Sequence, residues 1–333
     1  MSGGKASETG LDPELRPVPA ALANEAPRPL WSVLIPTRNS GDYLRITLES
    51  VLRQNIPVED MEIIVMDDCS ESEESVRDCL RPWGSRVQLI RHDRNVGKCA
   101  NYQSGLSASR GRLLHLLHGD DFVYDGFYRS MEACFAAYAA AGAFFCESDY
   151  VNAAGQVTGR TGCELPATGI IPAFSELLYV RQRIQTPSIV VRRPVYESLG
   201  GFDHRLTAFE DWEMWFRISL AFPIGFNAEG RAAYRISEGN TSTQSILSGR
   251  RTYLLQKTLR IMDDDCPDEL RRKLSRQRNR EMADYLMNCL KVTVAQRAVW
   301  PWLRIVLAIL SFDCSARRMA RVLLQTLRLI RRG

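Results

Sequence analysis

Two adjacent aspartates that follow a short apolar run are the residues of this chain best placed to do chemistry. Residues 113–117 are typical of a buried strand, and His118, Gly119, Asp120 and Asp121 come directly after them. Adjacent carboxylates repel each other, and a bound divalent cation removes that cost. Oxygen ligands are the ones that Mg²⁺ and Mn²⁺ prefer. The alternative is a plain surface turn, for which Gly-Asp-Asp is ordinary chemistry.

Two further acidic pairs occupy comparable places. Asp67 and Asp68 follow the apolar run 61–66, and Glu210 and Asp211 open the segment 210–220, which has helical character. An ionised carboxylate can accept a hydrogen bond from a ligand or take a proton from a hydroxyl. The structural alternatives are capping of a helix and favourable interaction with the positive end of a helix dipole.

The elements that must position these acids alternate between strand and helix. Apolar runs predict strands at 31–36, 61–66, 87–91 and 113–117, and helical spacing or composition predicts helices at 42–54, 71–80 and about 98–108. Further along we expect strands at 143–150, 186–191 and 232–236 and helices at 127–141, 194–199 and 210–220, with irregular loops and short strands at 152–171. This alternation is typical of a parallel α/β sheet, in which ligands bind at the carboxyl ends of the strands.

Composition narrows the class of protein. The 333 residues are 45% hydrophobic and 25% charged, which suits a soluble chain with one large domain and an appendage, or with two domains. The nine cysteines form no CxxC pair and no signal peptide is evident, so we expect reduced thiols in the cytoplasm. Residues 250–333 hold 19 Lys and Arg against 8 Asp and Glu, whereas the remainder is mildly acidic, which argues against nucleic acid as a partner of the main domain.

Five clusters, taken in order, resemble the motifs of the family 2 glycosyltransferases. They are Pro36-Thr37-Arg38-Asn39, Asp67-Asp68-Cys69-Ser70, Asn95-Val96-Gly97-Lys98, His118-Gly119-Asp120-Asp121, and Gly200-Gly201-Phe202-Asp203 followed by Glu210-Asp211-Trp212. The resemblance covers roughly residues 31–243. It implies the GT-A fold, an α/β architecture with a Rossmann-like, mostly parallel central sheet and flanking helices.

The resemblance implies a nucleotide-diphosphate sugar as donor. The donor-binding residues that it implies are Pro36, Thr37, Arg38, Asn39, Asp67, Asp68, Gly97, Lys98, His118 and Asp121. Asp67 or Asp68 would accept the imide N–H of a uracil or thymine base, since an ionised carboxylate only accepts. Gly97 permits close approach of the backbone, and Lys98 would reach a phosphate as a point charge or else lie solvated on the surface.

The same resemblance implies a metal cofactor, Mn²⁺ or Mg²⁺, with Asp120 as its ligand. Asp121 would orient the ribose, the metal's water or the loop. His118 stands where the motif has its first acid, and it would bond the donor's sugar or simply cap the strand. Histidine ligates Mn²⁺ less typically than oxygen does.

Family members generally invert the anomeric centre, so the resemblance makes Asp211 the base that takes the acceptor's proton, with Glu210 beside it. Trp212 and Arg235 are weaker acceptor contacts, Trp212 because a tryptophan at helical spacing is often part of the core. The family often has a histidine where this chain has Ser237. If that histidine helps to hold the metal or the diphosphate, Arg235 would take over this role. No QxxRW motif follows, which indicates one sugar per encounter rather than a processive synthase.

We expect three regions: a flexible tail at 1–29, the glycosyltransferase domain at 30–245 and a basic helical region at 246–333. Residues 299–312 are apolar, but they are too few to span a bilayer. Together with the arginines that follow, they suit an amphipathic helix in a membrane interface. The alternatives are a helical hairpin packed on the protein and a self-association contact. The predicted location is the cytoplasm, with the cytoplasmic face of the membrane as the peripheral option.

The leading hypothesis is therefore a metal-dependent, inverting hexosyltransferase of polysaccharide biosynthesis that acts on a glycan or a lipid-linked saccharide. A non-catalytic protein that binds nucleotide-sugars or glycans on the same fold is the alternative, which His118 and Ser237 favour. A nucleotidyltransferase ranks last, because no Gly-rich phosphate loop follows Pro36.

Overall fold

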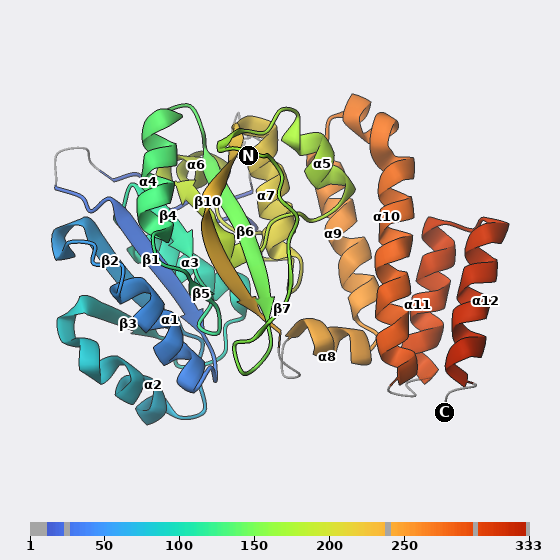
Figure 1. Ribbon diagram of the computed structural model, residues 1–333, viewed down its shortest axis with the longest axis horizontal. Helices are drawn as coiled ribbons and strands as arrows, with labels where there is room; N and C mark the ends of the chain where they lie inside the picture. Colours follow the sequence, from blue (N-terminus) through green and yellow to red (C-terminus); the bar gives the residue numbers. More distant parts are fainter. Residues whose placement is uncertain (1–11, 23–26, 237–240, 296–298, 331–333) are drawn as a thin grey trace, which may run out of the picture. The chain divides into compact units, whose positions relative to one another are not determined.

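Four parallel strands form the part of the sheet that carries most of the motifs. In spatial order they are β3 (Val87–Arg91), β2 (Met61–Asp67), β1 (Trp31–Thr37) and β4 (Leu113–Leu116), as the computed structural model shows in Figure 1. Thr37 is in register with Asp67, and Asp67 with Arg91, so the carboxyl ends of these three strands coincide. The strand order reverses between β1 and β4, which is where such sheets bind ligands.

The other part of the sheet is mixed in direction. β9 (Ile189–Arg192) is antiparallel to β4 and to β6 (Ala143–Val151), whereas β6 is parallel to β10 (Ile224–Arg235). The short strands β5 (Phe122–Val123), β7 (Val157–Arg160) and β8 (Gly169–Ile170) each pair antiparallel. Only the end of β10 was predicted, and the first three residues of the predicted strand 186–191 form the 3₁₀ turn η3 (Thr186–Ser188).

Helices cover both faces of the sheet, and the strands between them read as continuous apolar runs because they are buried on both sides. The helices α1 (Asp42–Leu52), α2 (Glu73–Leu80) and α4 (Phe127–Ala137) share a core with alternate residues of β1 and β2. The other face is covered by α3 (Lys98–Ala108), α6 (Arg193–Leu199) and α7 (Glu210–Ala221) (Figure 1). The helices α1, α2 and α3 follow β1, β2 and β3 in the chain and therefore begin near the carboxyl ends of those strands.

The structure describes residues 12–22, 27–236, 241–295 and 299–330. The chain divides into two compact units. Unit 1 comprises Met1–Phe174 and Ile184–Ile236, and unit 2 comprises Ser175–Arg183 and Ser237–Gly333. The boundary predicted between residues 245 and 246 lies within α8 (Thr241–Leu247).

Residues 12–22 do not behave as the flexible tail that the sequence suggested. Arg16 is buried, and its guanidinium pairs with Asp203 at 2.9 Å and with Glu213 at 3.1 Å. The N–H of Gly201 donates to the carbonyl of Pro17 at 2.8 Å. Because these partners lie far along the chain, the composition of the segment alone could not reveal them.

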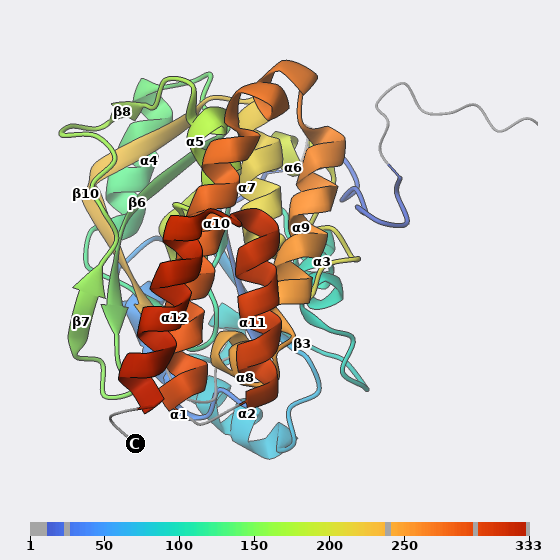
Figure 2. The ribbon, with the colours of Figure 1, turned by 90° about the vertical axis from the view of Figure 1, so that its right-hand side faces the viewer.

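Unit 2 is helical. It holds most of α5 (Phe174–Val180), together with α8, α9 (Arg251–Asp265), α10 (Asp268–Ala295), α11 (Val299–Phe312) and α12 (Ala316–Ile330). Within it, α11 and α12 lie side by side in front of α10 in Figure 2. Among the described residues, no helix combines the length and the apolar character that crossing a bilayer requires.

Candidate active site

The loop after β4 is fixed tightly against β1. The N–H of Gly119 donates to the carbonyl of Pro36 at 3.0 Å, and a Cβ at Gly119 would lie 2.9 Å from Oγ1 of Thr37. Asp121 is buried, and its Oδ1 accepts the N–H of Arg235 at 2.8 Å. Glycine at position 119 therefore lets the two strand ends meet and holds the following acids in place.

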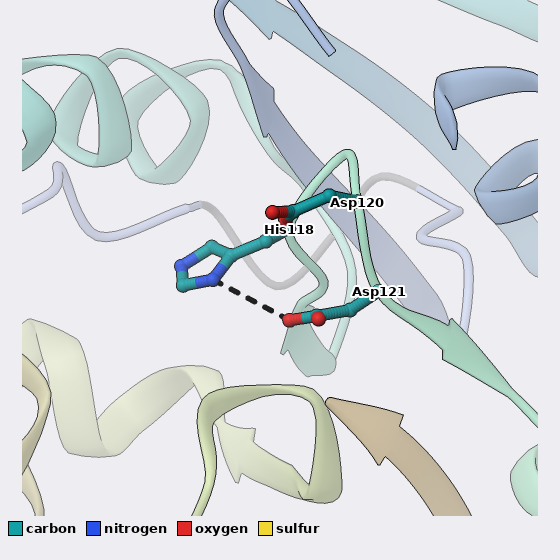
Figure 3. A group of neighbouring side chains, drawn as sticks. All are labelled: His118, Asp120 and Asp121. Atoms are coloured by element: carbon teal, nitrogen blue, oxygen red, sulfur yellow. Dashed lines mark ion pairs between the residues drawn. The ribbon is translucent and has the colours of Figure 1, made fainter. Parts of the chain in front are cut away.

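Figure 3 shows that His118, Asp120 and Asp121 cluster at the end of β4. One ligand atom from each lies within 4.8 Å of the others. Oδ2 of Asp121 is buried and has no hydrogen bond among the described residues, although Nδ1 of His118 is 3.5 Å away. Burial and the charge of Asp120 raise the pKa of Asp121 to about 6. A buried carboxylate oxygen without a donor, next to a second acid, fits an oxygen-preferring divalent cation.

The second acidic pair lies close to this cluster. Phe209, whose φ of 59° is left-handed, turns the chain into α7, so that Glu210 and Asp211 stand in its first turn. The hydroxyl of Tyr102 is 2.9 Å from Nε2 of His118 and donates to Oε1 of Glu210 at 3.5 Å. Tyr102 therefore connects the loop after β4 with the start of α7.

The two members of this pair differ in charge balance. Burial acts to raise the pKa of Glu210, but Lys98, whose Nζ is 3.3 Å away, a backbone hydrogen bond and the charge of His118 together outweigh burial and leave the pKa lowered. Burial and the charge of Glu210 raise the pKa of Asp211, which is partly exposed. Oδ2 of Asp211 accepts the hydroxyl of Thr186 at 3.1 Å. A carboxylate with a raised pKa and one face open suits proton abstraction.

The acids that end β2 mainly hold loops. Asp67 is fully buried, accepts the N–H of Ser70 at 3.1 Å and pairs with Arg91. Asp68 accepts the N–H groups of Val96 at 2.6 Å and Gly97 at 3.1 Å. Of the pair, Asp68 is the one that retains some exposure, at 6%.

The ends of β1 and β2 are bound to each other. The N–H of Asn39 donates to the hydroxyl of Ser70 at 2.9 Å, and Arg38 and Asn39 are exposed. Asn39 and Cys69 both have left-handed backbone angles, with φ values of 55° and 57°. Such strained positions cluster at functional sites.

Two residues predicted as acceptor contacts are buried in this structure. Trp212 is 1% exposed and packs on Phe209, so it offers no stacking surface. Arg235 is 2% exposed, and its guanidinium donates to backbone carbonyls, including that of Asp120 at 2.8 Å. It holds the loop after β4 instead of facing an acceptor. Ser237, whose place the family often gives to histidine, lies outside the described residues.

Three residues that no motif indicated also belong to the site: Tyr102, Thr186 and Arg91. Tyr102 is four residues after Lys98 on α3, and this spacing puts both on one face of the helix. Arg91 ends a strand at the edge where the acids gather. Both signals are present in the sequence, whereas Thr186 has none that we recognise.

Part of this chain is similar in sequence to known glycosyltransferases. Residues 32–159 match the family model for glycosyl transferase family 2. The putative teichuronic acid biosynthesis glycosyltransferase TuaG of Bacillus subtilis is 33% identical over 97 residues, which are 28% of this chain and 37% of that protein. The chain spans only 33% and 37% of the length of two curated relatives that it matches.

The solved structures extend the match to the fold. TarS 1–349 of S. aureus, in complex with UDP-GlcNAc, superposes with a TM-score of 0.59 at 15% identity, covering 86% of this chain and 91% of that one. The mannosyltransferase PcManGT from Pyrobaculum calidifontis, in complex with GDP-Man and Mn²⁺, gives a TM-score of 0.58 at 16% identity, covering 95% and 84%. The expected GT-A fold, with additional C-terminal helices, is confirmed.

Proposed function

We propose that the protein is a family 2 glycosyltransferase that moves a sugar from a nucleoside-diphosphate donor to a hydroxyl acceptor, with inversion and with help from a metal. The family match over residues 32–159 and the GT-A fold support the reaction class. The observation that carries the proposal is the link from Asp121 through His118 and Tyr102 to Glu210. This link holds the acid proposed to bind the metal and the helix that carries the proposed base at one edge of the sheet.

On the donor side, the loop Pro36–Asn39 lies along the base and ribose. We assign the base contact to Asp68 rather than Asp67, because Asp67 is fully buried and already paired with Arg91. Each oxygen of Asp68 accepts one backbone N–H from the Val96–Gly97 turn and retains a further lone pair. Lys98 stays near the diphosphate while it neutralises Glu210.

Asp120 and the buried Oδ2 of Asp121 would hold Mn²⁺ or Mg²⁺. His118 is less suited, because Nε2 is bonded to Tyr102 and Nδ1 faces Asp121. When bound, such a cation supplies Lewis-acid neutralisation of the leaving diphosphate. PcManGT, which shares the fold, is in complex with Mn²⁺, and this supports the choice of ion for the present protein.

On the acceptor side, Asp211 is the base. Its Oδ1 accepts the N–H of Trp212 at 2.8 Å and its Oδ2 accepts the hydroxyl of Thr186, so the carboxylate has a fixed orientation. The acceptor oxygen attacks C1 of the sugar, the bond from C1 to the diphosphate breaks, and the acceptor proton passes to Asp211. Glu210 stays ionised beside Lys98 and keeps the pKa of Asp211 raised.

The acceptor is a glycan or a lipid-linked saccharide, and one sugar is added per encounter, as the absence of a QxxRW motif supports. Relatives named for teichuronic and teichoic acid biosynthesis support a place in polysaccharide biosynthesis. We place the protein in the cytoplasm with hexosyl donors as its substrates.

The test is a panel of nucleotide-sugars, each measured by thermal shift and by release of nucleoside diphosphate, with Mn²⁺, with Mg²⁺ and with EDTA. We expect one donor class to stabilise the protein in a metal-dependent manner and to be consumed when a hydroxyl acceptor is supplied. Stabilisation without turnover across varied acceptors would favour the non-catalytic alternative. Neither stabilisation nor turnover with any donor would overturn the proposal.

A further inference from the structure

The last two described helices of unit 2 expose large apolar side chains to an unusual degree. On α11, Trp300 is 75% exposed and Leu307 is 60% exposed, whereas Ile305 and Ile309 on the opposite side are fully buried. Leu303 lies between them at 38%. The helix therefore has one side in the core of unit 2 and a second apolar side that the described part of the chain leaves uncovered.

The neighbouring helix repeats the pattern. On α12, Leu323 is 60% exposed, Leu324 53% and Met319 49%, and Val322 is buried. Because α11 and α12 lie side by side (Figures 1 and 2), their exposed side chains belong to adjacent helices of one unit. We call these six exposed residues, with the arginines beside them, the α11–α12 face. Scattered exposed apolar residues need no explanation, but a group on two adjacent helices indicates a binding surface.

The charged residues on the two helices themselves all have one sign, and Asp284 of α10 lies 3.9 Å from Arg321. Neither α11 nor α12 contains Asp or Glu, and Arg304, Arg317 and Arg321 are exposed. Arg318, by contrast, is buried and pairs with Asp284 and with Asp313, so it serves the packing of the helices. The exposed arginines lie beside the apolar side chains and leave the face strongly basic.

We propose that the α11–α12 face binds the surface of a membrane that contains anionic lipid. Apolar side chains with tryptophan enter the boundary of the acyl chains, and the arginines contact the phosphates of the headgroups. At 14 residues α11 is shorter than the ~20 that a spanning helix needs, so it would lie in the plane of the interface. The proposal does not depend on the function proposed for unit 1.

Charge favours this partner over a second copy of the chain. A symmetric dimer formed through this face would bring the exposed Arg304 and Arg317 of both copies into one interface, with no acid on α11 or α12 to compensate them. Anionic headgroups supply the opposite charge without any such requirement. The surface therefore complements lipid phosphates better than it complements itself.

Flotation of the full chain with vesicles tests the proposal. The vesicles are either pure phosphatidylcholine or phosphatidylcholine with about 30% phosphatidylserine, at low and at high salt. We expect flotation with the anionic vesicles, weakening as salt screens the arginines. The double variant Trp300→Ser/Leu307→Ser should lose about tenfold in partitioning, because burial of two apolar side chains is removed. Arg304→Glu/Arg317→Glu should weaken binding to anionic vesicles by a comparable factor.

Matched variants control for general effects. Val58→Ser/Val157→Ser removes apolar side chains that are 65% and 54% exposed in unit 1, and Arg272→Glu/Arg276→Glu reverses two exposed charges on α10. Both should float like the wild type, and circular dichroism should report folded protein throughout. The proposal is overturned if the chain floats with neither kind of vesicle. A concentration-dependent dimer that Trp300→Ser/Leu307→Ser abolishes also overturns it, since the occupant is then a second copy.

Discussion

Each of the two acidic pairs of the site has one buried and one partly exposed acid, and the order of the two along the chain is reversed between the pairs. In the loop after β4 the first acid, Asp120, is partly exposed and the second, Asp121, is buried. At the start of α7 the first acid, Glu210, is buried and the second, Asp211, is partly exposed. Each pair therefore offers one carboxylate to ligands and keeps one inside, and the two inner acids are joined through His118 and Tyr102.

The pairs differ in what compensates the buried charge. Lys98 lies 3.3 Å from Glu210 and lowers its pKa, so this acid is ionised without any ligand. The guanidinium of Arg235 donates to the carbonyl of Asp120, and burial together with the charge of Asp120 raises the pKa of Asp121 to about 6. Glu210 therefore pairs with the ammonium of Lys98, whereas Oδ2 of Asp121 faces the imidazole of His118 at 3.5 Å and has a second acid, Asp120, beside it. This difference supports our proposal that the metal binds at the loop after β4 and that α7 carries the base.

The strongest test of this division is Asp211→Asn. The amide cannot take the acceptor's proton, so we expect turnover to fall by about 10³-fold. Affinity for the donor should stay within a factor of two or so, because the base acts on the acceptor. Turnover and calorimetric donor binding, measured on the same preparation, give the two values.

The matched control is Asp125→Asn, which makes the same change at a surface ion pair with Arg53. It should leave both values unchanged. If Asp211→Asn weakened donor binding strongly and kept wild-type turnover at saturating donor, the two pairs would have to exchange roles.

The complementary change is Asp120→Ala. Removing the exposed acid of the first pair should weaken Mn²⁺-dependent donor binding by about 100-fold, since an oxygen ligand is lost. Binding measured in EDTA should change little. Calorimetry with and without Mn²⁺ separates the two effects, and Asp125→Ala is the control. Equal weakening in both conditions would indicate a contact with the donor itself instead of the metal.

A third prediction concerns a histidine in β4, the strand that precedes the Asp120–Asp121 pair. His115 on β4 is buried, with Nε2 2.9 Å from the carbonyl of Pro187 and Nδ1 3.0 Å from the hydroxyl of Tyr128. Burial lowers the pKa of His115 to about 4. Below pH 6.5 the unfolded chain therefore takes up a proton that the folded protein does not bind, and stability present at neutral pH is lost as the pH falls. Between pH 7.5 and 5 we expect a loss of about 2 kcal/mol.

Urea unfolding at the two pH values measures this loss. In His115→Gln the pH-dependent loss should be smaller by most of that amount, although the variant will be less stable at both pH values. His92→Gln, at a half-buried histidine bonded to Ser104, is the control and should keep the wild-type slope. An unchanged slope in His115→Gln would place the titrating group elsewhere.

The acids were predictable because each motif combines a local residue type with a local position. Asp67, Asp120 and Glu210 stand at the end of an apolar run or at the start of a helical one, and parallel strands bring their carboxyl ends to one edge. Type and spacing are enough for that inference. The link from Asp121 to Glu210 through His118 and Tyr102 then follows from the fold and not from distance along the chain.

The structure differs from the expectations mainly where side chains are buried, because a single sequence does not record burial. Trp212 and Arg235 have the residue types that bind sugars, but their neighbours enclose them. The start of β10 was missed because its alternation is broken where the register shifts between Asn227 and Arg231. Arg16 falls in the predicted tail because its partners Asp203 and Glu213 are distant in sequence.

The smallest predicted effect tests whether the two pairs act as one unit. Tyr102→Phe removes the hydroxyl between His118 and Glu210, and a lost hydrogen bond of this kind costs on the order of 1 kcal/mol. We expect turnover to fall by about tenfold with donor affinity unchanged. Tyr138→Phe, whose hydroxyl donates to the carbonyl of Thr168 at 3.2 Å, is a matched control that should retain full turnover.

A double-mutant cycle with Glu210→Gln makes the result specific. If Tyr102 acts through Glu210, the second substitution should add less in the presence of the first than it does alone. Additive losses would mean that Tyr102 only supports the packing of α3 and that each acidic pair works independently. The cycle therefore measures the coupling between the two halves of the site, which the resemblance of either motif to its family could not reveal.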